Sequence, residues 1–154
     1  LSEEYIENNE QKRDALASLN NGYYSGLNNS DELFIKESEL IKEVADKESC
    51  VIVGRCADFI LSSRKNVINV FVYSDMEDKI NRATTYYGMD KSKAEKEIKR
   101  IDKLRANHYK YYTEKEWDNH SNYDICINSD AFGVEKSADL ICELVESKLE
   151  MVNA

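Results

Sequence analysis

Three short apolar runs, separated by segments with helical periodicity, constrain the fold of this chain most strongly. They span residues 49–53 (SCVIV), 67–73 (VINVFVY) and 123–128 (YDICIN). Continuous apolar runs of this length, rich in β-branched residues, are typical of strands buried on both faces of a parallel sheet. The sequence therefore predicts an α/β fold in which strands alternate with helices.

The segments between these runs have apolar residues at helical spacing and polar residues suited to capping. We predict helices over residues 2–19, 30–46, 56–63, 74–87, 91–112 and 134–149, with a loop over 20–29. The apolar face of the last helix is expected at Val134, Ala138, Ile141, Val145 and Leu149. No linker or repeat interrupts the chain, so we treat residues 1–154 as one domain, with a lid region at about 84–105.

Composition excludes several classes of function. A net charge of −9 argues against a broad nucleic-acid surface, because phosphate backbones are bound by clustered Lys and Arg. It leaves small nucleotides open, since a few converging arginines hold a phosphate on an acidic protein. No apolar run is long enough to cross a membrane, and the start does not resemble a signal peptide. We therefore expect a cytoplasmic protein; dimerisation is left open.

Cysteine and histidine show no metal-ligand spacing. The four cysteines, which lie in or beside apolar stretches, are expected to be buried and reduced: Cys50, Cys56, Cys126 and Cys142. His108 and His120 are isolated from other ligand types. We therefore propose no metal site in protein side chains.

The residues that follow the first apolar run are the first candidates for chemistry, because ligands bind at the carboxyl ends of parallel strands. Gly54 permits a sharp turn there, and Arg55 then offers a guanidinium fork for phosphate. Asp58 either orients Arg55 or caps the next helix. A surface arginine in an ordinary turn is the alternative, and a two-residue motif does not decide between them.

The long helix over 91–112 places Arg105 on the same face as its apolar residues, with Asp102 one turn before it. An arginine on a buried stripe has an anionic partner, which is either a protein carboxylate or a ligand phosphate. The alternative is that Arg105 lies at the solvent-exposed end of an ordinary stripe.

Basic residues bracket the hinge at 84–93: Lys79 and Arg82 precede it, and Arg100 follows it. This pattern suits a lid that closes over phosphates, although a solvated helix face is the more common explanation. The aromatic residues over 108–117 are expected to pack at a helix end, with base stacking as a weaker alternative.

Four segments together resemble the cytidylate-kinase-like family: 50–61 (CVIVGRCADFIL), 70–73 followed by its helix, 101–112 (IDKLRANHYKYY) and 123–128. The resemblance implies a three-layer P-loop NTPase-like parallel sheet flanked by helices. It implies ATP with Mg²⁺ as phosphoryl donor and CMP, dCMP or a related monophosphate as acceptor. This chain contains no G-x-x-x-x-G-K-[ST] phosphate loop, since Gly22 and Gly26 are followed by neither Lys nor Thr of that pattern. By the resemblance, the first strand and its phosphate loop are expected in an upstream segment.

The resemblance also assigns residues to roles. The catalytic set that it implies is Arg55, Arg82, Asp102 and Arg105. The substrate-binding set is Gly54, Arg55, Asp58 and Arg105.

Two departures from the family pattern favour a second hypothesis. Val53 and Cys56 stand where cytidylate kinases carry aspartates around the arginine of the GR motif. Together with the absent loop, these replacements fit a non-catalytic nucleotide-binding or regulatory module. The retained Arg55, Asp102 and Arg105 favour the kinase.

Overall fold

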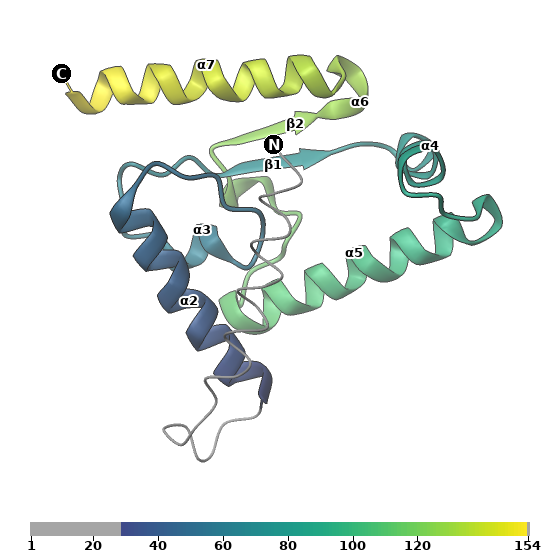
Figure 1. Ribbon diagram of the computed structural model, residues 1–154, viewed down its shortest axis with the longest axis horizontal. Helices are drawn as coiled ribbons and strands as arrows, with labels where there is room; N and C mark the ends of the chain where they lie inside the picture. Colours follow the sequence, from purple (N-terminus) through teal and green to yellow (C-terminus); the bar gives the residue numbers. More distant parts are fainter. Residues whose placement is uncertain (1–28, 154) are drawn as a thin grey trace. The chain divides into compact units, whose positions relative to one another are not determined.

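The computed structural model describes residues 29–153 (Figure 1). The predicted helix over 2–19 and most of the predicted loop over 20–29 lie outside the described residues. The chain divides into two compact units, Leu1–Ile52 and Val53–Ala154, which are described separately. The prediction that residues 1–154 form one domain stays a prediction.

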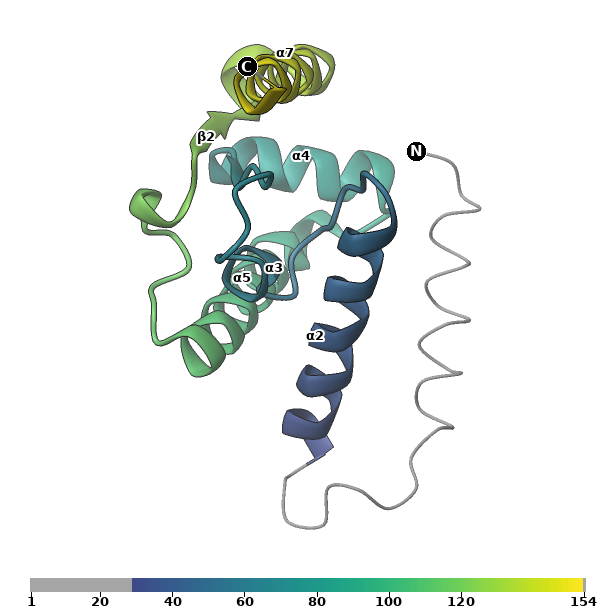
Figure 2. The same cartoon turned by 90° about the vertical axis from the view of Figure 1, so that its left-hand side faces the viewer.

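The described part of the first unit is dominated by α2, Asn29–Lys47, which confirms the predicted second helix. Asp31 and Glu32 lie in its first turn and Lys47 in its last, so charges of both signs are favourably placed in the helix dipole. Figure 2 shows α2 as one uninterrupted helix. Ile41 is its buried residue.

The run at 49–53 is not a strand, which corrects the first strand prediction. Val51 is 68% exposed and Val53 is 86% exposed, whereas a central parallel strand would bury both. A strand forms only where a neighbouring strand pairs with its amide and carbonyl groups. Within residues 29–153, the paired strands are β1 and β2 alone, and neither pairs with this run.

The sheet consists of β1, Val70–Tyr73, and β2, Ile125–Asn128, which confirms the other two strand predictions. The strands are parallel, with Val70 opposite Ile125 and Tyr73 opposite Asn128 (Figure 1). At their entry, the Asn69 backbone N–H donates to Oδ2 of Asp124 over 2.6 Å.

Aromatic rings cover the start of this sheet. The ring centroid of Phe71 lies 4.9 Å from that of Tyr123 and 5.3 Å from that of Trp117. The Tyr123 hydroxyl donates to the Trp117 carbonyl over 2.6 Å. The predicted packing role is therefore confirmed for Trp117.

Two helices lie between the strands along the chain and contact each other: α4, Met76–Tyr86, and α5, Lys91–Thr113. Asp75 caps α4 by accepting from the Asp78 N–H, so the helix begins two residues later than the predicted start at residue 74. Asp90 caps α5 through the Ser92 N–H. Gly88 follows the C-cap residue of α4 and adopts a left-handed φ of 62°, a conformation that glycine commonly supplies after a helix end.

The remaining helices are α3, Ala57–Ile60, α6, Ser129–Phe132, and α7, Val134–Asn153. A 3₁₀ turn, His120–Asn122, lies between α5 and β2. The predicted helix over 56–63 is thus shorter in the structure, and α6 has no counterpart in the predictions. The apolar face predicted for α7 is rotated: Val145 and Leu149 are 39% and 54% exposed, while Ser137 is buried. The inward side holds Ser137 with the half-buried Leu140, Ile141 and Leu144, and the Ser137 hydroxyl is satisfied there by donating to the Gly133 carbonyl over 2.7 Å.

The cysteine prediction holds in part. Cys56 is buried, but Cys50 and Cys142 are exposed. Among residues 29–153, no helix combines the length and apolar character that crossing a membrane requires. The described residues thus form a mixed α/β structure with a small parallel sheet.

Candidate functional site

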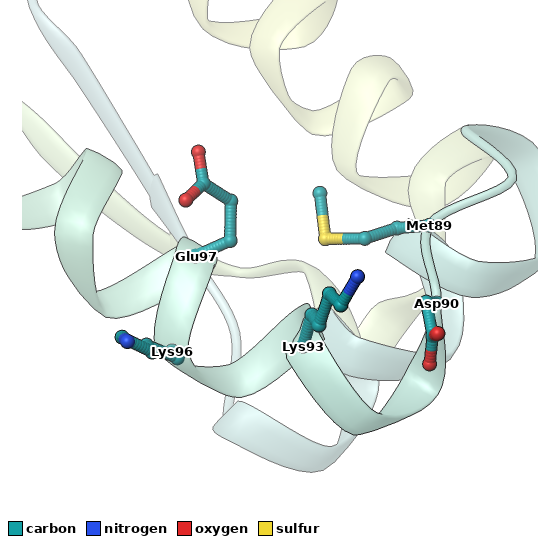
Figure 3. Close-up of a pocket in the computed structure, with 5 residues that line it drawn as sticks. All are labelled: Met89, Asp90, Lys93, Lys96 and Glu97. Carbon is teal, nitrogen blue, oxygen red and sulfur yellow. The ribbon is translucent and has the colours of Figure 1, made fainter.

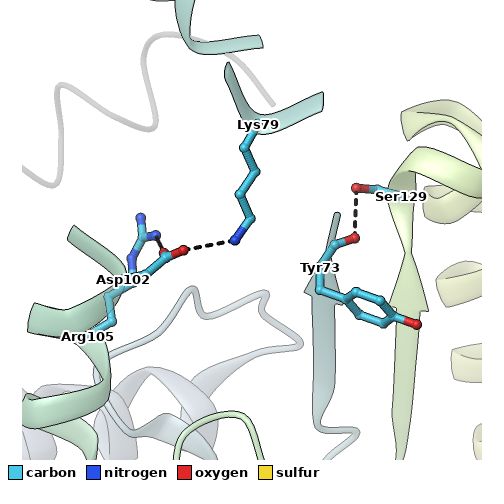
Figure 4. A network of polar contacts seen from close by, with 5 residues as sticks. All are labelled: Tyr73, Lys79, Asp102, Arg105 and Ser129. Carbon is cyan, nitrogen blue, oxygen red and sulfur yellow. Dashed lines mark hydrogen bonds and ion pairs between the residues drawn. The ribbon is translucent and has the colours of Figure 1, made fainter. Parts of the chain in front are cut away.

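Asp102 joins cations from two helices (Figure 4). Its Oδ2 atom lies 2.8 Å from Nζ of Lys79 on α4, and its Oδ1 atom lies 2.9 Å from Nη1 of Arg105 on α5. The Asp102 side chain is 23% exposed and that of Lys79 is 32% exposed, so the ion pair between the helices is partly shielded from solvent. One carboxylate between two cations leaves a net positive charge at this point.

The Arg105 side chain extends into solvent and is 59% exposed. The prediction of a core position for Arg105 is therefore wrong, and the alternative, the exposed end of the stripe, is right. The buried residues of the helix are Ala94, Tyr109 and Thr113. Half-buried Asp102 lies three residues before Arg105 and buried Tyr109 lies four residues after it, so Arg105 shares their side of α5 although its own side chain is exposed. Exposure leaves the Arg105 guanidinium accessible to a ligand while Asp102 fixes one of its nitrogens.

Arg82 lies on α4 three residues after Lys79, which places the two cations on the same side of that helix. It is half-buried. Lys79, Arg82, Asp102 and Arg105 thus come from two contacting helices, and the contacts of Asp102 bring Lys79 and Arg105 together.

Gly54, Arg55 and Cys56 form a left-handed turn, with φ values of 72°, 56° and 56°. The turn is closed by the Ala57 N–H, which donates to the Gly54 carbonyl over 3.1 Å. Left-handed backbone is unstrained at Gly54, but it costs about 1–2 kcal/mol at a residue with a side chain. Two such residues in succession indicate a backbone that the surrounding contacts impose. Arg55 is exposed on this turn, whereas Cys56 is buried.

Asp58 is held by α5. Its Oδ2 atom accepts a hydrogen bond of 2.5 Å from the Tyr109 hydroxyl, and Tyr109 is 4% exposed. Asp58 lies in the first turn of α3, whose N-cap residue is Cys56. The sequence suggested two roles for Asp58. It does not cap α3, and its carboxylate accepts from Tyr109 instead of orienting Arg55.

Burial and then the bond to Asp58 raise the pKa of Tyr109 above its usual range. Burial, followed by the negative charge of Asp58, raises the pKa of Tyr123 to about 12. Both phenols therefore stay protonated at neutral pH, and Tyr109 remains a donor to Asp58.

The first turns of α5 border an open pocket of about 450 Å³, lined by Met89, Asp90, Lys93, Lys96 and Glu97. In Figure 3, the side chains of Met89, Lys93 and Glu97 extend toward a common space, whereas Lys96 and Asp90 point away from them. This pocket lies within the predicted lid region. Its mixed charges and openness give it little selectivity for a phosphate.

Arg100, predicted as a lid residue, pairs with a neighbour on its own helix. Its side chain forms two hydrogen bonds with Glu97, of 2.8 and 2.6 Å. This bonding lowers the pKa of Glu97 and raises that of Arg100. Arg100 thus behaves as part of a solvated face, which was the more common explanation of the pattern.

The described residues fit a phosphate better than they fit Mg²⁺. Lys79, Arg82 and Arg105 supply cations, but residues 29–153 contain no group of three His, Cys, Asp or Glu arranged to hold a metal ion.

Two features were missed from the sequence alone. Lys79 was seen only as a basic lid residue, and its pairing with Asp102 depends on the packing of α4 on α5. Tyr109 was grouped with the aromatic run, although it follows Arg105 by one helical turn. That four-residue spacing could have placed Tyr109 beside Arg105 on the same side of the helix.

These features are those of an α/β protein with an ionic cluster between two neighbouring helices. Comparison of the sequence with known protein families gives a match: the model of the cytidylate kinase-like family matches residues 1–131. The chain belongs to the cytidylate kinase-like family, a group of nucleotide kinase-like proteins.

Two relatives support the assignment. A cytidylate kinase from Archaeoglobus fulgidus is 28% identical over 108 residues, which cover 70% of this chain. The chain spans 59% of the length of that kinase. A crystal structure of an uncharacterised protein from Eubacterium ventriosum is 32% identical with a TM-score of 0.68, over 79% of this chain and 69% of that one.

Proposed function

We propose that this chain is the acceptor side of a nucleoside monophosphate kinase that transfers a phosphoryl group from ATP to CMP, dCMP or a related monophosphate. The observation that carries the proposal is the cluster at Asp102, where Lys79 and Arg105 meet, in a chain of the cytidylate kinase-like family. The proposal includes a three-layer P-loop NTPase architecture and a cytoplasmic location for the complete protein.

In the proposed reaction, the bond between the γ-phosphorus of ATP and its bridging oxygen breaks, and an oxygen of the acceptor monophosphate bonds to that phosphorus. The products are ADP and a nucleoside diphosphate. Such transfer depends mainly on positioning and on neutralising the charge of the phosphoryl oxygens. Arg55, Arg82 and Arg105 supply the positive charge, and Asp102 orients Arg105 through its 2.9 Å contact.

The substrate-binding role of Gly54 follows from its turn, which presents Arg55 to solvent. Arg55 and Arg105 are the residues that we propose to contact the acceptor phosphate. Each is exposed, as a group that binds a soluble nucleotide must be.

A specific observation supports the second candidate, a non-catalytic nucleotide-binding or regulatory module. Valine at position 53 and cysteine at position 56 supply no carboxylate where the resemblance leads one to expect aspartates, and Cys56 is buried besides. Under this alternative the arginines bind a nucleotide that is not phosphorylated.

The test is turnover by the complete protein with MgATP and CMP, dCMP or UMP, measured by ADP release. The Arg105→Ala variant is expected to lose about 100-fold or more in kcat, because it removes charge from the transition state. Lys103→Ala, an exposed cation two residues away on α5, is the matched control and should retain activity. Wild-type turnover in Arg105→Ala would refute the assignment, whereas nucleotide binding without ADP release would favour the non-catalytic module.

A further inference from the structure

The left-handed turn at residues 54–56 has an unfavourable backbone that other contacts must stabilise. Two of its three residues, Arg55 and Cys56, carry side chains that disfavour this backbone. The helix that follows, α3, is only four residues long, and the side chain of its N-cap residue does not cap it. A hydrogen bond to a distant part of the chain would therefore add to the bond from Ala57 to Gly54 that closes the turn.

Asp58 connects the turn to α5 by a hydrogen bond. It lies two residues after the turn and accepts the 2.5 Å hydrogen bond from Tyr109, 51 residues further along the chain. Tyr109 is itself fixed, because it is buried and its carbonyl accepts from the Thr113 hydroxyl over 2.7 Å. The hydrogen bond thus connects the turn to a buried residue of the long helix.

The position of Tyr109 on α5 relates this tie to the site. Tyr109 follows Arg105 by four residues, which is about 6 Å along a helix axis. We propose that Tyr109 and Asp58 are positioning residues, which hold the 54–56 turn so that Arg55 stays at a fixed distance from Arg105. The inference rests on the proposed function for its substrate, since the two arginines are expected to share one acceptor nucleotide.

Asp58 is thereby a positioning residue instead of a member of the substrate-binding set that the resemblance implies. One of its carboxylate oxygens is occupied by a protein donor, and the residue is half-buried. An acidic group that touched the acceptor phosphate would repel it, whereas one turned toward Tyr109 does not. Asp58 acts on the substrate only through Arg55.

The experiment compares four variants of the complete protein: Tyr109→Phe, Asp58→Leu, Asp58→Asn and Tyr111→Phe. Tyr109→Phe removes the donor and keeps the ring, while Asp58→Asn keeps an oxygen that still accepts. Tyr111→Phe removes an exposed phenol from the same helix and is the matched control. Two quantities are measured: amide hydrogen exchange of residues 54–58 without nucleotide, and KM and kcat for the acceptor monophosphate.

In Tyr109→Phe and Asp58→Leu, exchange at residues 54–58 should accelerate by about tenfold, the effect of one hydrogen bond to a charged group. The KM for the acceptor should rise more than kcat falls. Asp58→Asn and Tyr111→Phe should stay close to the wild type in both measurements.

Two outcomes would overturn the inference. One is unchanged exchange at residues 54–58 in Tyr109→Phe. The other is Asp58→Asn with a KM as high as that of Asp58→Leu, which would place the Asp58 charge on the substrate. If no monophosphate is phosphorylated, the proposed function fails, and the exchange measurement alone then supports or overturns the role of Tyr109.

Discussion

The ammonium group of Lys79 lies 2.8 Å from Oδ2 of Asp102 and joins α4 to α5. The same carboxylate holds Arg105 through its other oxygen. A single acidic group therefore links the two helices and orients the arginine proposed for catalysis. Substitutions of Lys79 are therefore expected to alter the orientation of Arg105 through Asp102, without removing a contact to a substrate.

The energy of this pair is open to measurement by a double-mutant cycle with Lys79→Met and Asp102→Asn. Because both side chains are less than one-third exposed, we expect a coupling of about 1 kcal/mol, at the upper end for ion pairs near a surface. Urea denaturation of the wild type, the two single variants and the double variant gives this value.

The matched control is the cycle at Lys99 and Glu95, an ion pair within α5 whose side chains are 64% and 55% exposed. Its coupling should be smaller than that of Lys79 with Asp102. Equal couplings would mean that the contact between α4 and α5 does not depend on the shielded pair.

Strain in the 54–56 turn can be separated from the chemistry of Arg55. Arg55→Gly and Arg55→Ala both remove the guanidinium, but only glycine relieves the left-handed φ of 56°. We expect Arg55→Gly to be more stable than Arg55→Ala by about 1 kcal/mol, with equal losses of turnover.

The control for this comparison is Arg82, which lies inside the right-handed helix α4. There the glycine variant should be less stable than the alanine variant by about 1 kcal/mol, the reverse order. The same order at both positions in thermal or urea unfolding would contradict the assigned backbone of the turn.

Thiol reactivity should follow burial. Cys50 and Cys142 are exposed and are expected to react rapidly with iodoacetamide, whereas the buried Cys56 should react only when the protein opens. Peptide mapping by mass spectrometry after brief labelling distinguishes the sites. Rapid labelling of Cys56 would show that the 54–56 turn opens readily in the native protein.

Stability should fall at alkaline pH through the buried phenols. The pKa of Tyr123 is raised to about 12 from an ordinary value of 10.0, so the folded state keeps a proton that the unfolded state releases. The stabilisation is complete below pH 10.0 and is lost as the pH rises through about 12. Tyr109, whose pKa is also raised, contributes in the same direction.

Tyr109→Phe has one buried phenol fewer to ionise, so its free energy of unfolding should decline less steeply above pH 10.0. Urea denaturation at several pH values measures the slope. Tyr111→Phe, which alters an exposed phenol, should show the wild-type slope. A wild-type slope in Tyr109→Phe would argue against burial of its hydroxyl.

Local pattern was sufficient to predict elements whose caps and apolar spacing agree. The helix over 91–112 was predicted within one residue of α5, and the strands over 67–73 and 123–128 contain β1 and β2. The run over 49–53 has the same composition, but a strand depends on a neighbour, which composition does not reveal. The face of α7 was misjudged for a related reason: apolar residues lie both at the spacing of Ile141, Val145 and Leu149 and at that of Leu140, Ile141 and Leu144, and only packing shows that the second set is the half-buried one.

The candidate site was predictable where it depends on neighbours along one helix. The pairing of Asp102 with Arg105 follows from a three-residue spacing. The bonds from Lys79 to Asp102 and from Tyr109 to Asp58 join residues 23 and 51 positions apart, and only tertiary packing brings these groups together.

The pairing of β1 with β2 also governs the order in which the molecule assembles. Parallel strands cannot be joined by a tight turn, and the contact at their entry closes a loop of 55 residues. Closing such a loop loses more chain entropy than bringing together α4 and α5, which follow each other directly along the chain. The helix pair should therefore form early in folding, and the sheet should form late and be the step most sensitive to chain truncation.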